Sequence, residues 1–123
     1  MEQPLPEIID RLTIVRLKVE RIKTEDKRDE YEHYLKELEE WKKRGVEIKQ
    51  EWIDRLYEAN AKIWDLEHDI RRGKEGELGM EEDGRRAIQI REINKMRISI
   101  KNEIVEATGS GFKDIKMNHA SAD

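Results

Sequence analysis

Cysteine is absent from this chain of 123 residues, and proline occurs only twice. The lack of cysteine excludes disulfide bonds, thiolate metal sites and cysteine nucleophiles. No apolar run approaches the roughly 20 residues that a membrane-spanning helix requires. The N-terminal M-E-Q-P-L-P-E also lacks the basic and apolar regions of a signal peptide. We therefore expect a soluble, cytoplasmic protein that does not enter a membrane.

The chain is rich in charged residues. Charged residues make up 44% of the sequence and hydrophobic residues 36%, with a mean hydropathy of −0.99. Because both signs are interleaved and the net charge is only −4, disorder is expected at the ends alone. The apolar residues suffice for narrow stripes on helices rather than for a thick globular core. One elongated helical domain is the expected class, and self-association would let it bury more apolar surface.

Two helices are predicted in the N-terminal part of the domain. Pro6 and Glu7 mark the start of the first helix, over residues 6–23, which is the most apolar part of the chain. The hydrophobic phase breaks near Thr24, a candidate N-cap for a second helix over 25–44, and Gly45 is a typical helix end. A single bent helix across both ranges is the alternative.

The most regular pattern of the sequence belongs to the third helix. Its apolar residues alternate at spacings of four and three, as in a helix that packs along its whole length against another. These residues are Trp52, Leu56, Ala59, Ile63, Leu66 and Ile70. The third helix is predicted over 46–72, a glycine-rich loop over 73–84, a fourth helix over 84–108 and an irregular tail over 109–123.

The predicted fold class is therefore all-α. Four helices in two antiparallel hairpins would form an elongated, coiled-coil-like four-helix bundle, with residues 1–108 as one domain. The third and fourth helices would form the centre of a homodimer, because they are the longest helices with an apolar seam.

Polar residues interrupt the apolar seams of both long helices. Arg86 and Arg97 are eleven residues apart, so they share one azimuth of the fourth helix to within about 20°. Antiparallel packing about the glycine-rich loop brings Asn60 of the third helix near Arg97. A slip of one turn would instead bring Asn60 to Asn94, or Glu67 to Arg86, and both registers give a polar layer. The predicted polar layer consists of Asn60, Glu67, Arg71, Arg86, Arg91, Asn94 and Arg97.

Two interpretations of this layer stay open. In the first, Asn60 and Glu67 satisfy the arginines and fix the register of the helices at some cost in stability. In the second, surplus cations bind a small anionic ligand, such as phosphate, a sugar phosphate or a nucleotide. Six basic residues lie between Arg85 and Lys101 against the single acid Glu92, which favours an anion.

An enzymatic function is the third interpretation. The acid pairs Glu37 with Glu40 and Glu51 with Asp54 resemble those with which MazG-type nucleotide pyrophosphohydrolases hold magnesium. Such pairs also arise by chance in a chain with 29 acids. The three histidines fall in separate segments without metal-ligand spacing, so we expect neither a metal nor a cofactor. Nucleic acid is a weak candidate partner, because the fourth helix lacks aromatic residues that stack on bases.

Two stretches of the C-terminal half, N-A-K-I-W-D-L-E-H-D-I-R at 60–71 and R-A-I-Q-I-R-E-I-N-K-M-R at 86–97, carry a resemblance. They resemble an uncharacterised family of short, charged, all-helical proteins from surface-glycan gene neighbourhoods and from marine bacterial and phage sequences. The resemblance implies no catalytic residues, and it admits a sugar phosphate or nucleotide as ligand. It also implies that one set of residues acts together: Asn60, Trp64, Asp65, Glu67, Arg71, Arg86, Arg91, Asn94 and Arg97. The sequence as a whole favours a non-catalytic structural, adaptor or accessory protein.

Overall fold

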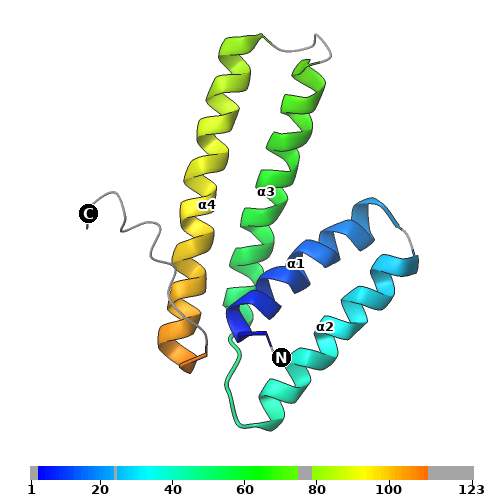
Figure 1. Ribbon diagram of the computed structural model, residues 1–123, viewed down its shortest axis with the longest axis vertical. Helices are drawn as coiled ribbons and strands as arrows, with labels where there is room; N and C mark the ends of the chain where they lie inside the picture. The colour runs from blue at the N-terminus through cyan, green and yellow to red at the C-terminus, as the bar shows by residue number, and fades with distance from the viewer. Residues whose placement is uncertain (1–2, 24, 75–78, 111–123) are drawn as a thin grey trace.

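Four α-helices make up the computed structural model of the chain (Figure 1). They are α1 (Leu5–Arg21), α2 (Glu25–Lys43), α3 (Gln50–Lys74) and α4 (Met80–Thr108). The structure describes residues 3–23, 25–74 and 79–110, without the side chains of 69–74 and 80. The predicted N-cap Thr24, the middle of the glycine-rich loop and the tail beyond Ser110 lie outside the described residues.

The prediction of an all-α fold is confirmed, because four helices pack antiparallel in a bundle-like arrangement of two hairpins. α3 and α4 form one long hairpin, and α1 and α2 form a shorter hairpin that crosses it at an angle (Figure 1). α1 is the central element, because it contacts α2 as well as both long helices. The half of the α3–α4 hairpin nearest its connection extends beyond α1 and α2 (Figure 1).

The apolar core lies where α1 crosses the base of the long hairpin. Full burial of one large apolar side chain stabilises a fold by about 1.5–3 kcal/mol. α1 contributes the most residues to this core, which explains why its sequence is the most apolar of the chain. The buried cluster consists of Leu5, Ile8, Ile9, Leu12, Leu38, Trp52, Leu56, Ile100 and Ile104.

The N-terminal segment forms two helices rather than one bent helix. α1 ends at Arg21 and α2 begins at Glu25. Lys23, which lies between them, has a φ of 59°, a left-handed conformation that no continuous α-helix contains. The end of α2 also follows the prediction, since Gly45 adopts a φ of 87° and donates its N–H to the carbonyl of Lys42.

The third helix begins later than predicted, at Gln50 instead of residue 46. Residues 46–49 form no helix, and Val46 and Ile48 pack against the core from the connection between α2 and α3. Two residues of an extended segment that are two apart point to the same side, so this connection can bury both side chains. This packing, rather than a helix, accounts for their apolar character.

The fourth helix begins earlier than predicted, at Met80 instead of residue 84, with Gly79 as its N-cap residue. Three acids in its first turn, Glu81, Glu82 and Asp83, interact favourably with the helix dipole, so the helix extends through Gly84. Its C-terminus confirms the prediction, because Gly109 is the C-cap residue with a φ of 73°.

The start of α1 lies beside the end of α4, and side chains of α3 and α4 bond each other nearby. Ser110 accepts a hydrogen bond from the backbone N–H of Leu5 at 2.9 Å, which satisfies one free donor at the start of α1. Glu103 of α4 accepts hydrogen bonds from Trp52 and Arg55 of α3, at 3.1 and 2.7 Å. No helix in the part of the chain that the structure describes is long and apolar enough to cross a membrane.

Candidate functional site

The polar layer is centred on Asp10, a residue of α1 rather than of the long helices. Asp10 is only 4% exposed, although ionised carboxylates are rarely buried unless they are paired. The fold of α1 explains its position, because the helix buries residues on several sides between α2 and the α3–α4 hairpin. The face of α1 that carries Asp10 and Thr13 is thereby pressed against α3 and α4.

Asn60 of α3 provides the first partner of Asp10. Its amide nitrogen donates to the carboxylate of Asp10 at 3.0 Å and to the hydroxyl of Thr13 at 2.8 Å. The hydroxyl of Thr13 itself donates to the carbonyl of Asp10 at 2.7 Å, so it can only accept from Asn60. The carboxylate of Asp10 and the hydroxyl of Thr13 therefore both require that the amide NH₂ of Asn60, rather than its oxygen, faces them.

Arg97 of α4 provides the second partner. One terminal nitrogen of its guanidinium donates to the other carboxylate oxygen of Asp10 at 2.6 Å. Its second terminal nitrogen donates to the side-chain carbonyl of Asn94 at 2.8 Å. The buried Nε of Arg97 has no hydrogen-bond partner among the residues that the structure describes. Asn94 thus orients the guanidinium while Asp10 balances its charge.

These contacts form one network, which we call the Asp10 network and define as Asp10, Thr13, Asn60, Asn94 and Arg97. The network joins three helices, and both oxygens of its carboxylate accept a hydrogen bond. Replacing such a buried ion pair by apolar residues is often neutral, whereas removing one partner is costly. The network thus connects α1 to both α3 and α4 through one buried carboxylate.

A crevice of about 330 Å³ opens beside the Asp10 network. Asn60 and Arg97 lie in its wall, and Glu67 contributes an exposed carboxylate to its rim. Apolar side chains form the remaining walls: Ile14, Leu17, Ile63 and Trp64. The amide oxygen of Asn60 accepts none of the hydrogen bonds of the network, in which only the amide nitrogen takes part.

Three of the predicted residues, Asn60, Asn94 and Arg97, thus come together, and Glu67 lies nearby. Arg86 forms an ion pair with Glu82 at 3.3 Å on its own helix, about 16 Å along α4 from Arg97 at 1.5 Å per residue. Arg91 is exposed. The side chain of Arg71 lies outside the described residues.

The positive band of α4 is largely neutralised by acids. Five of its six basic residues form ion pairs, with partners in the first turn of α4, farther along α4 or in α1. Arg85 and Arg86 pair with Glu82, Lys95 with Glu92, Arg97 with Asp10 and Lys101 with Glu7. The excess of positive charge that favoured an anionic ligand is therefore small in the folded protein.

Asp10 and Thr13 are the site residues that the sequence analysis missed. One signal could have identified them. Asp10, Thr13 and Leu17 follow each other at spacings of three and four in the most apolar helix, which places two polar residues on a face that also carries a leucine. An acid on such a face needs a buried partner.

The aromatic residues of α3 contact the charged end of α1. The hydroxyl of Tyr57 donates to the carboxylate of Glu20, and this hydrogen bond, together with burial, raises the pKa of Tyr57 above its ordinary value. Arg21 lies over the ring of Trp64 and pairs with Asp65 at 2.5 Å. Trp64 lines the crevice, whereas Asp65 holds the end of α1.

The acid pairs that suggested a magnesium-dependent enzyme lie on α2 and α3. Among the described residues, no three histidine, aspartate or glutamate side chains converge closely enough to hold a metal ion.

Comparison of the chain with protein-family models, curated proteins and solved structures gave no match. The resemblance to a family of short helical proteins thus stays a prediction.

Proposed function

We propose that this protein is a cytoplasmic, non-catalytic helical protein of structural, adaptor or accessory type that works by association through its helices. Its first partner is a second copy of the chain, joined by coiled-coil-like packing of the α3–α4 hairpins into a central bundle. The paired carboxylate of the Asp10 network supports a structural role for the buried polar groups, because both of its oxygens already have donors.

One observation carries this proposal. The long hairpin extends beyond α1 and α2 (Figure 1), and α4 leaves two large apolar side chains in solvent, Ile88 at 55% exposure and Met96 at 57%. Groups of exposed apolar side chains on a rigid helical surface are typical of sites of association. Burial of this surface against another helical hairpin would complete a four-helix bundle.

The test is the molar mass of the intact chain, measured by light scattering at micromolar concentration. We expect the mass of two chains. The mass of a single chain would overturn the proposal, because no association would then occur at a concentration at which typical homodimers persist.

A second candidate function is the binding of a small ligand in the crevice beside the Asp10 network. The observation that favours it is that Asn60, Glu67 and Arg97 line one crevice whose other walls are apolar. Binding sites commonly combine apolar walls with a few polar groups. A sugar phosphate or nucleotide would offer hydroxyl donors to Asn60 and Glu67 and an anion to Arg97, although Arg97 is already paired with Asp10.

A further inference from the structure

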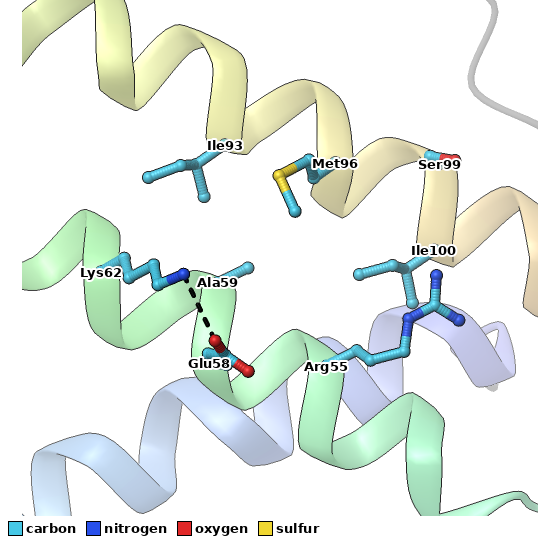
Figure 2. Close-up of a pocket in the computed structure, with 8 residues that line it drawn as sticks. All are labelled: Arg55, Glu58, Ala59, Lys62, Ile93, Met96, Ser99 and Ile100. Carbon is cyan, nitrogen blue, oxygen red and sulfur yellow. Dashed lines mark ion pairs between the residues drawn. The ribbon is translucent and has the colours of Figure 1, made fainter.

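The face of the α3–α4 hairpin opposite α1 carries a shallow groove of about 230 Å³. Figure 2 shows Met96 of α4 across from Ala59 of α3, with Ile93 across from Lys62 and Ile100 near Arg55. The Asp10 network and the crevice lie on the other face, where α1 contacts the long helices. The groove is therefore a separate feature with an apolar floor and a charged rim.

The charges along this groove follow a pattern that differs between the two helices. On α3, Arg55 and Lys62 lie on either side of the small Ala59, at spacings of four and three residues. On α4, Glu92 and Glu103 lie on either side of Met96, four residues before it and seven after it. Such spacings keep residues on one side of a helix. The α3 edge of the groove thus carries two cations on either side of a small residue, together with the carboxylate of Glu58. On α4, two carboxylates lie on either side of a large residue.

We propose that this face binds the same face of a second copy, with a two-fold axis that runs parallel to α3 and α4. This inference rests on the proposed function, which requires association, and adds which surface associates and in which orientation. α3 of each copy lies against α4 of the other, and Met96 of each copy packs against Ala59 of the other. Lys62 of each copy meets Glu92 of the other, and Arg55 meets Glu103.

The choice of axis follows from the register within one chain. Arg55 already lies beside Glu103, at 2.7 Å, and Ala59 and Met96 line the same groove. A two-fold axis parallel to the helices leaves the position of every residue along the bundle unchanged. It places α3 of one copy opposite α4 of the other. Opposite charges therefore meet at both ends of the groove, and each helix keeps antiparallel neighbours.

The alternative axis, perpendicular to the helices, brings α3 against α3. This axis reverses the direction of α3 in the second copy. Arg55, four residues before Ala59, would then approach Lys62 of the other copy, three residues after its Ala59. Like charges in direct contact destabilise an interface. The charge pattern therefore selects the parallel axis.

The ion pairs that Lys62 and Glu92 form within one chain do not prevent them from pairing with each other across the dimer interface. Lys62 pairs with Glu58 at 3.3 Å and Glu92 with Lys95 at 3.4 Å, and all four side chains are more than half exposed. Exposed pairs of this kind contribute little to stability. Lys62 and Glu92 can therefore form new pairs across a dimer interface.

A charge-swap experiment tests this interface. Lys62→Glu gives each homodimer two Glu–Glu contacts, and Glu92→Lys gives it two Lys–Lys contacts. We expect each variant alone to dissociate with a constant at least about tenfold above that of the wild type at low salt. Mixing the two variants restores opposite charges at both contacts, so an equimolar mixture should form a heterodimer about as stable as the wild-type dimer.

The matched control is Lys43→Glu, an exposed change of the same charge on α2, away from the groove. It should leave dissociation unchanged, and circular dichroism should confirm that all variants remain helical. A dimeric wild type whose dissociation does not respond to Lys62→Glu, or a mixture that fails to associate, would overturn this interface while leaving the proposed function intact. A monomeric wild type would overturn both proposals.

Discussion

Removal of the guanidinium from the Asp10 network is the perturbation that the structure describes in most detail. In the Arg97→Leu variant, the carboxylate of Asp10 stays buried, at 4% exposure, and loses the cation that lies 2.6 Å away. Asn60 continues to donate one hydrogen bond to it. A buried charge with one neutral donor is poorly compensated, so the folded state should lose stability.

The expected loss is about 2–4 kcal/mol of the free energy of unfolding. Breaking a buried ion pair by removing one partner typically costs about 3–5 kcal/mol. The lower range applies here because the side chain of Arg97 is 22% exposed, so water reaches part of the site and can solvate Asp10. Against a total stability of roughly 5–15 kcal/mol for a domain of ordinary size, this loss is readily measured.

The assay is urea denaturation at pH 7 and 25 °C, followed by tryptophan fluorescence, since Trp52 is fully buried in the native state. All variants are compared at one chain concentration, because association makes apparent stability depend on concentration. The matched control is Arg91→Leu, which removes an exposed arginine from the same helix and should change stability by no more than about 0.5 kcal/mol.

The double variant Asp10→Leu/Arg97→Leu distinguishes the net contribution of the ion pair from the cost of leaving Asp10 without its cation. It removes both charges together, and Asn60 keeps its hydrogen bond to Thr13. We expect it to be more stable than Arg97→Leu alone and within about 1–2 kcal/mol of the wild type. A single variant as stable as the wild type, or a double variant less stable than the single one, would refute the role assigned to the Asp10 network.

Two further predictions concern the neighbouring groups. Tyr57→Phe removes the hydrogen bond to Glu20 and should cost no more than about 1 kcal/mol at pH 7. Since the pKa of Tyr57 is raised in the folded state, its protonated form stabilises the fold below the unfolded pKa near 10. That contribution is lost as pH rises through the folded pKa. The difference in unfolding free energy between wild type and variant should therefore decrease as pH rises above ~10, and a difference that grows with pH would contradict this. For the crevice, a sugar phosphate or nucleotide at ten times its dissociation constant should stabilise the protein by about 1.4 kcal/mol in a thermal-shift assay, whereas a flat response across both classes would refute the second candidate function.

Much of the fold could be predicted from local patterns. The four-and-three spacing of apolar residues identified α3, and glycines identified the ends of α2 and α4, because both features depend on residues close together in the chain. The predicted first residues of α3 and α4 were wrong in opposite directions, too early for α3 and too late for α4. Apolar residues before Gln50 pack against the core without forming a helix. Acids before Gly84 stabilise the first turn of α4, so this helix begins ahead of the glycine at which it was predicted to start.

The candidate site was predictable only in part. Asn60 was expected near Arg97 or, after a slip of one turn, near Asn94, because an antiparallel hairpin restricts the register to a few choices. The carboxylate that Asn60 and Arg97 share could not be assigned, because it depends on the angle at which α1 crosses α3 and α4. That angle arises from packing between distant segments, so the nearer acid, Glu67, was expected in place of Asp10.

The measurement that tests the account most directly is the molar mass of the wild-type chain as a function of concentration. Association through the α3–α4 hairpin predicts twice the 14.7 kDa of one chain at micromolar concentration, with a decrease toward a single chain on dilution. A mass of 14.7 kDa throughout this range would contradict the account, because the exposed face of the long hairpin would then have no partner in a second copy.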